Sequence, residues 1–292
     1  MPDIESRIAA LPIWSGPVNL APLAGGISNQ SFTATDRSGK YVVRITRDFP
    51  FHHVYRDREV MSARAAHAAG FAPEVVYAEP GLMVSRFIDG KVLSIDDVRG
   101  NIPGIAEFLA RFHRDMPAGI SGAGFIFWVF HVNRDYVRQL AGRGDDPRFA
   151  DWLTVNDELE AAQLALPIQF GHHDLLPANL IDDGKRLWLI DYEYAGFDTA
   201  MFDLANLSSN NNFSADQSRQ LLEAYFGRAP DEATLRSHAA MEAASLLREA
   251  LWSLVSVGLL DRPGVDYGAY ANENFVKLDA SLAAYRQRFG AR

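Results

Sequence analysis

Short runs of alternating apolar and polar residues dominate the first part of the chain. Such runs, separated by glycine, proline and aspartate, are typical of β-strands joined by turns. The predicted strands cover 18–26, 31–36, 41–47, 74–80 and 81–90. Between the third and fourth strands, residues 54–70 are rich in alanine, carry apolar residues at helical spacing and end at Gly70. The pattern there predicts a single inserted helix.

After Gly90 helical periodicity replaces the alternation. Residues 102–113 place Ile105, Phe108, Leu109 and Phe112 on one face of an amphipathic helix. Residues 125–165 also indicate helix, with irregular boundaries. Further helices are predicted over 202–208, 214–226, 234–258 and 268–288. The whole pattern predicts an α+β fold, with a sheet-rich N-terminal lobe over residues 1–88 and a mainly helical C-terminal lobe over residues 89–292.

A polar hairpin is predicted within the C-terminal lobe, in the segment FGHHDLLPANLIDDGKRLWLIDYEYAGFD at 170–198. Its two strands, at 178–183 and 186–191, are joined by Asp183–Gly184, a strong hairpin signal. Phosphoryl transfer from ATP needs a base for the attacking hydroxyl, metal ions for the phosphates and donors around them. Asp174 is a candidate base. Asn179 and Asp191 offer the oxygen ligands that Mg²⁺ prefers. The alternative is a solvated hairpin without chemistry.

His172 and His173 are a second candidate metal pair in this segment. Adjacent residues in an extended loop point to opposite sides, so they rarely share one ion. We therefore expect His172 to form hydrogen bonds with the loop backbone.

Composition narrows the function classes. The net charge of −9 argues against a nucleic-acid binder, which needs a basic face, and suits a cationic substrate. The absence of cysteine excludes disulfides, thiolate catalysis and zinc–thiolate sites. The acidic first residues do not form a signal peptide, and the longest apolar stretch, 250–260, is shorter than the about 20 residues of a membrane span. A cytoplasmic protein without a membrane span is expected.

The hairpin motifs resemble those of one enzyme family. His172–His173–Asp174, four residues and Asn179, followed by Asp191–Tyr192–Glu193, resemble the H-x-D-x-x-x-x-N and D-x-D/E motifs of choline/ethanolamine kinases and aminoglycoside phosphotransferases. These enzymes are relatives of the protein kinases. The resemblance implies a two-lobed protein-kinase-like fold and the cofactors ATP and Mg²⁺. It implies Asp174 as catalytic base, Asn179 and Asp191 as Mg²⁺ ligands, and Glu193 as a possible second metal ligand.

The N-terminal lobe extends the resemblance. Residues 23–34 are similar to the GG-x-[ST]-N turn of choline kinases, and a plain turn is the alternative. Glycines let the backbone approach phosphates, and small polar side chains donate hydrogen bonds there. The nucleotide-binding residues implied in this turn are Gly25, Gly26, Ser28 and Asn29.

A basic residue on the third strand is also expected to bind the nucleotide phosphates. Here it is Arg44, with Glu59 as its helix partner, and arginine binds phosphate bidentately. A surface salt bridge is the alternative. The adenine-binding hinge would fall in 85–90, near Phe87. The segment around Asp203 also matches the family, and Asp203 is expected to brace the catalytic loop rather than to take part in chemistry.

Three aromatic residues suggest the acceptor. Tyr194, Trp252 and Tyr270 match positions of choline kinases and would form a cage for a quaternary ammonium through cation–π contacts of roughly 0.5–2 kcal/mol each. Core packing is the alternative for Trp252. Where choline kinases often carry a second tryptophan, this chain has Glu249, a turn before Trp252. A carboxylate suits a primary ammonium and favours ethanolamine, unless Arg248 neutralises it or it faces solvent.

The resulting prediction is an ATP- and Mg²⁺-dependent phosphotransferase that phosphorylates the hydroxyl of a small cationic amino alcohol, choline or ethanolamine. The resemblance also suggests a possible homodimer. One rival is an aminoglycoside-type phosphotransferase with a wide acidic cleft. The other is a nucleotide-binding pseudokinase, favoured by Arg44 in place of the usual lysine.

Overall fold

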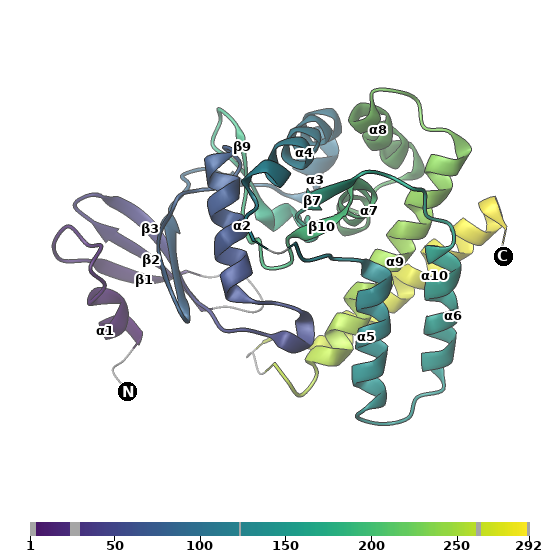
Figure 1. Ribbon diagram of the computed structural model, residues 1–292, viewed down its shortest axis with the longest axis horizontal. Coiled ribbons are helices and arrows are strands. Elements are labelled where there is room, and N and C mark those ends of the chain that lie inside the picture. The colour runs from purple at the N-terminus through teal and green to yellow at the C-terminus, as the bar shows by residue number, and fades with distance from the viewer. Residues whose placement is uncertain (1–3, 24–29, 123, 261–263, 291–292) are drawn as a thin grey trace.

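The computed structural model describes residues 4–23, 30–122, 124–260 and 264–290. An antiparallel sheet lies at one end of the molecule and a group of helices lies at the other (Figure 1). Helix α2 (Arg56–Ala68) lies beside the sheet, on the side that faces the helices. This is the predicted α+β architecture.

The N-terminal sheet has the order β1-β2-β3-β5-β4, and every neighbouring pair is antiparallel. Its strands are β1 (Asn19–Leu23), β2 (Gln30–Asp36), β3 (Gly39–Ile45), β4 (Val75–Glu79) and β5 (Leu82–Arg86). Tyr41 and Val43 of β3 are buried in a small core with Ile8 of α1 (Ile4–Ala9). Because side chains alternate along a strand, Arg44 points to the other face, where α2 lies. The single helix between the third and fourth strands confirms the prediction.

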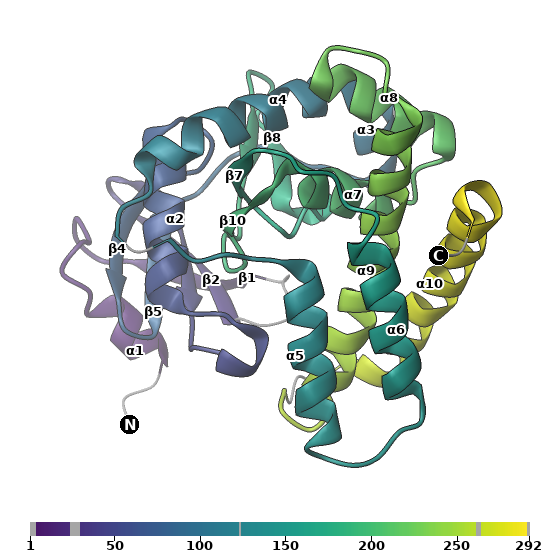
Figure 2. The same ribbon diagram turned by 45° about the vertical axis from the view of Figure 1, so that its right-hand side comes forward.

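Helix α9 (Glu232–Ser256) is the centre of the helical region. It packs against α5 (Val129–Ala141), α6 (Arg148–Glu160), α7 (Ala200–Asn210) and α10 (Tyr267–Phe289). Figure 2 shows α5, α6 and α10 beside α9. Nearly every residue of α9 after Leu235 is buried, as expected for a helix that is surrounded on all sides.

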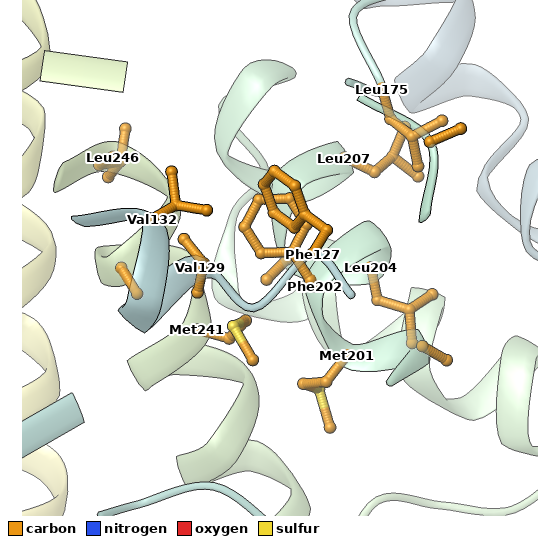
Figure 3. Packing of buried hydrophobic residues seen from close by; sticks show 14 of the residues in the cluster. Phe127, Val129, Val132, Leu175, Met201, Phe202, Leu204, Leu207, Met241 and Leu246 are labelled. Carbon is orange, nitrogen blue, oxygen red and sulfur yellow. The ribbon is translucent and has the colours of Figure 1, made fainter. Parts of the chain in front are cut away.

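The main hydrophobic core continues from these helices to the segment that carries the polar hairpin. Figure 3 shows Phe127 beside Phe202 of α7, with Met201, Leu204 and Met241 around them. The remaining helices are α3 (Ile95–Gly100), α4 (Ile102–Asp115) and α8 (Ala215–Phe226). None of the helices in the described part of the chain is long and apolar enough to cross a membrane.

Two short antiparallel sheets lie at the polar hairpin, and the first of them contains the hairpin itself. Strands β8 (Leu180–Asp182) and β9 (Leu187–Leu189) form the predicted hairpin, and β6 (Lys91–Val92) adds a third strand. The second sheet pairs β7 (Ile168–Gly171) with β10 (Gly196–Thr199). This second pair was not predicted, because four residues are too few to show alternation. The chain therefore enters and leaves the hairpin through two adjacent strands, which brings residues 172 and 195 close together.

Candidate active site

Asp203 holds the loop that carries Asp174. The backbone N–H groups of His172 and His173 each donate to an Asp203 carboxylate oxygen, both at 2.8 Å. His113 lies 2.8 Å from the same carboxylate. Although burial works against its charge, these donors hold the pKa of Asp203 below its usual value. The predicted bracing role is confirmed.

The two histidines also have structural partners on opposite sides. His172 Nε2 lies 2.9 Å from the carbonyl oxygen of Ile190, and His173 Nδ1 lies 3.0 Å from that of Tyr194. His173 also stacks on Phe127 at 4.3 Å. Burial lowers the pKa of His172 and lowers that of His173 to about 4, so both rings are neutral near pH 7. The expected backbone hydrogen bond of His172 is confirmed.

Asp174 and Asn179 lie together across the turn. The Asn179 side-chain N–H group donates to the carbonyl oxygen of Asp174 at 2.8 Å and to its carboxylate at 3.1 Å. The amide oxygen of Asn179 is then the atom a metal ion would use. Burial raises the pKa of Asp174 well above its usual value; the charge of Arg248 opposes this rise, and Glu249 and Asp191 add to it.

Arg44 lies at the centre of the first charged cluster. It donates to Glu59 at 2.6 Å and to Asp191 at 2.8 Å, and Glu193 lies 3.8 Å away. Burial works to lower the pKa of Arg44, but the three carboxylates outweigh it and raise that pKa. The predicted contact between Arg44 and Glu59 is thus present, and it is largely buried rather than a surface pair.

Arg56 completes this Arg44 cluster and was missed in the sequence. It donates to Glu59 at 2.6 Å and to Glu193 at 2.7 Å. Its signal was available, because Arg56 precedes Glu59 by three residues and so shares a helix face with it. Burial, and then the charge of Asp191, raise the pKa of Glu193. The Arg44 cluster therefore contains Arg44, Arg56, Glu59, Asp191 and Glu193.

The donor set at this cluster fits Mg²⁺. No group of three or more histidine, aspartate or glutamate side chains in the described ranges is arranged to hold a metal alone. Mg²⁺ does not need one, because it is usually bound by one or two carboxylates, water and substrate phosphates. Asn179 and Asp191 offer such oxygens. Asp191 adopts a left-handed backbone conformation (φ 68°) just after β9, which turns the chain toward Glu193.

Two other parts of the predicted nucleotide site belong to the N-terminal sheet region. The residues Gly25, Gly26, Ser28 and Asn29 lie outside the described ranges, between paired strands β1 and β2. Phe87 lies between β5 and β6, where the chain leaves the N-terminal sheet. Its backbone N–H donates to the carbonyl oxygen of Lys40 at 3.0 Å, and Lys40 Nζ lies 3.7 Å from its ring centroid.

The residues predicted to bind the acceptor lie together. Trp252 Nε1 donates to the hydroxyl of Tyr194 at 2.8 Å, and the hydroxyl of Tyr270 donates to Glu249 at 3.4 Å. Glu249 is only 8% exposed and accepts from Arg248. We refer to Tyr194, Arg248, Glu249, Trp252 and Tyr270 as the Arg248 cluster.

His52 is a further member of this neighbourhood that sequence reasoning missed. It stacks on Trp252 at 5.0 Å and lies 2.9 Å from the hydroxyl of Ser256. Burial lowers the pKa of His52 to about 2, so the ring is neutral. No local pattern links His52 to a helix two hundred residues later.

Comparisons with known proteins agree with this geometry. A model of the phosphotransferase enzyme family matches residues 19–238. The crystal structure of a choline/ethanolamine kinase family protein from Mesorhizobium loti is 30% identical, with a TM-score of 0.76 and 97% of each chain covered. Choline kinase LicA from Streptococcus pneumoniae is 21% identical, with a TM-score of 0.76 over 97% of this chain and 98% of that one.

A further relative, protein LicA from Haemophilus influenzae, is 23% identical over 271 residues, which cover 88% of this chain and 77% of the relative. The similarity thus extends over both the sheet and the helices, and the two-lobed, protein-kinase-like fold predicted from the motifs is confirmed. The chain belongs to the phosphotransferase enzyme family, within its choline/ethanolamine kinase group, and is a small-molecule kinase.

Proposed function

We propose that the protein transfers the γ-phosphoryl group of ATP, with Mg²⁺, to the hydroxyl of a small amino alcohol, choline or ethanolamine. The observation that carries this proposal is the place of Asp174. Its carboxylate accepts a hydrogen bond from Asn179 at 3.1 Å, and Asp203 fixes the loop that carries it. The charges of both clusters also act on its pKa. A fixed carboxylate near both a phosphate site and an acceptor site is what an in-line transfer needs as its base.

The roles of the residues follow from this placement. The hydroxyl oxygen of the acceptor forms a bond to the γ-phosphorus as the bond from that phosphorus to the ADP oxygen breaks, and the hydroxyl proton passes to Asp174. Arg44, held by Glu59, binds the α- and β-phosphates. Asn179 and Asp191, with Glu193 as a second carboxylate, would hold Mg²⁺, which neutralises phosphate charge when bound. Gly25, Gly26, Ser28 and Asn29 would surround the phosphates, and Phe87 would lie at the adenine.

The acceptor is assigned from the Arg248 cluster. Aromatic rings and a carboxylate suit a small cation, and Glu249 favours a primary ammonium over a quaternary one. The names of the relatives agree with this choice. We place the division between the lobes near residue 88, where the chain leaves the N-terminal sheet. A homodimer and a cytoplasmic location are further parts of the proposal, and sizing in solution and fractionation test them.

An assay of ADP release tests the function. The purified protein is given ATP and Mg²⁺ with choline, ethanolamine, other small amino alcohols or aminoglycosides, and Asp174→Ala serves as control. Turnover on a small amino alcohol, lost in the variant and without Mg²⁺, is expected. Turnover on aminoglycosides alone would keep the mechanism and overturn the acceptor. No turnover on any compound would overturn the proposal.

A further inference from the structure

Arg248 is the most buried charged side chain near the acceptor site. It is 2% exposed and lies in α9 directly before Glu249. Its Nη1 donates to Glu249, and its guanidinium lies over the ring of Tyr194, 4.4 Å from the centroid. Within the described part of the chain, Nε and Nη2 have no hydrogen-bond partner. Buried donors without a partner are rare in native proteins and call for a physical explanation.

The position of Arg248 also changes the expected aromatic cage. One face of Tyr194 is already covered by a permanently charged guanidinium, and Trp252 is stacked on His52. The hydroxyl of Tyr194 is used as well, because it accepts from Trp252. A quaternary ammonium on that face of Tyr194 would therefore meet a like charge. Two of the ring faces that the aromatic residues alone suggested for choline are already occupied.

The free donors of Arg248 match a different chemical group. Nε and Nη2 lie along one edge of the planar guanidinium, and this edge binds a carboxylate with two parallel hydrogen bonds. Both atoms are closed off from solvent in this structure, so an acceptor carboxylate reaches them only when a neighbouring side chain moves aside. Charge-assisted hydrogen bonds are strongest in such a shielded place. Next to them Glu249, with Tyr270, presents a carboxylate that suits an ammonium group. Asp174, which takes the hydroxyl proton, interacts with both Arg248 and Glu249.

We propose that Arg248 binds a carboxylate of the acceptor, so that the preferred acceptor is a hydroxy-amino acid rather than a bare amino alcohol. The acceptor carboxylate binds Nε and Nη2 of Arg248, its ammonium binds Glu249, and its hydroxyl faces Asp174. This inference rests on the proposed phosphoryl transfer and names its substrate class. The bonds that form and break are those given above: only the acceptor is different.

Four related compounds isolate each group of the acceptor. L-Serine carries hydroxyl, ammonium and carboxylate; ethanolamine lacks the carboxylate, 3-hydroxypropanoate lacks the ammonium, and choline lacks the carboxylate and has a methylated nitrogen. Each is assayed for ADP release with ATP and Mg²⁺. We expect kcat/KM for L-serine to exceed that for each of the others by about tenfold or more, because a site built around polar groups discriminates against compounds that lack them.

Two variants link this preference to Arg248. Arg248→Lys keeps the charge and loses the bidentate edge, and the double variant R248M/E249Q removes both partners of the ion pair, so no unpaired charge is left buried. Both should lose the preference for L-serine over ethanolamine. Calorimetric titration of L-serine into the ATP-free protein gives a readout independent of turnover, and binding should weaken about tenfold or more in both variants. Arg286→Met, which breaks a distant ion pair between a half-exposed arginine and the largely buried Glu158, is the matched control.

The outcomes separate the two proposals. Turnover on ethanolamine or choline that equals or exceeds turnover on L-serine overturns this inference and leaves the proposed function intact. A preference for L-serine that survives in both folded variants, as judged by circular dichroism, also overturns it. ATP binding with no turnover on any of the four compounds, and no L-serine binding, overturns the inference and counts against the proposed function as well.

Discussion

Two arginines, the largely buried Arg44 and the fully buried Arg248, each belong to a charged cluster, and their surroundings differ. Arg44 shares its cluster with one further arginine and three carboxylates, so the cluster carries one excess negative charge. Arg248 has a single carboxylate partner, and two of its N–H groups find no acceptor among the residues that the structure describes. The first site has excess negative charge and one N–H group, Arg56 Nη2, without a described acceptor; the second has no excess charge and two such groups. An excess of carboxylates suits a cation, whereas an excess of donors suits an anion.

The largest expected effect comes from Asp174, the proposed base. Asp174→Asn keeps the shape of the side chain and removes its proton-accepting carboxylate, so kcat should fall by about 10²- to 10⁴-fold. Steady-state ADP release measures this fall, and fluorescence titration checks that ATP still binds. Asp151→Asn, at an exposed position of α6, is the control and should keep full activity. A modest loss of kcat in Asp174→Asn would mean that Asp174 is not the base.

The next effect compares the two arginines directly. Arg44→Met leaves three carboxylates near the single charge of Arg56, and should lower the free energy of unfolding by about 3–5 kcal/mol. Arg248→Met leaves only Glu249 without its partner, so the free energy of unfolding should fall by less. Urea unfolding followed by circular dichroism measures both. Equal losses would show that the number of carboxylate partners does not distinguish the two clusters.

The pH dependence of the free energy of unfolding tests Asp203, which holds the loop that carries Asp174. The pKa of Asp203 is lowered in the folded protein, so the unfolded chain binds a proton more readily and stability rises with pH in this range. Its contribution is present above the unfolded pKa of about 3.9 and is lost as pH falls through the folded value. Asp203→Asn should cost about 1.5–3 kcal/mol at pH 7, and the difference from wild type should narrow below about pH 4.

Urea unfolding at several pH values measures this difference. A gap between wild type and Asp203→Asn that stays constant down to the acid limit would indicate that the charge of Asp203 is not what holds the loop. A gap that narrows instead between pH 5 and 7 would point to the buried histidines.

The smallest expected effect tests the aromatic side of the Arg248 cluster. Trp252→Phe keeps a ring against His52 but loses the hydrogen bond to Tyr194, worth about 0.5–1.5 kcal/mol. The KM of the acceptor should rise by roughly two- to tenfold, with little change in the KM of ATP. Trp188→Phe is the matched control, because Trp188 donates a similar bond to Asp183 on the hairpin. If the two variants changed the KM of the acceptor equally, Trp252 would not be part of the acceptor site.

The parts of the fold that sequence could predict are those set by local pattern. Alternation and helical spacing predicted the N-terminal sheet, α2 and the long helices, because each signal lies within one element. β7 and β10 were missed because they are four residues long and form only when the chain brings them together. The motif predicted Asp174 and Asn179 close together, and their hydrogen bond shows that they are, since only four residues separate them.

Neutralisation of Glu249 by its neighbour Arg248 was one of the alternatives read from the sequence, and the structure shows that ion pair. The parts that could not be predicted depend on contacts distant in sequence. The contact of His52 with Trp252 joins elements two hundred residues apart, and no spacing within either segment could indicate it. Such contacts shape the proposed acceptor site, so substrate choice is harder to predict from sequence than fold.

The stack of His52 on Trp252 has a thermodynamic consequence. His52 lies four residues before Arg56, where α2 begins, and Arg56 holds Glu59, the partner of Arg44. A continuous series of contacts therefore joins the acceptor side to the nucleotide side. If an acceptor displaces Trp252 and thereby changes the affinity for ATP, linkage requires ATP to change the affinity for that acceptor by the same factor. Each substrate should then change the affinity for the other, and the same factor can be measured by titrating either one in the presence of the other.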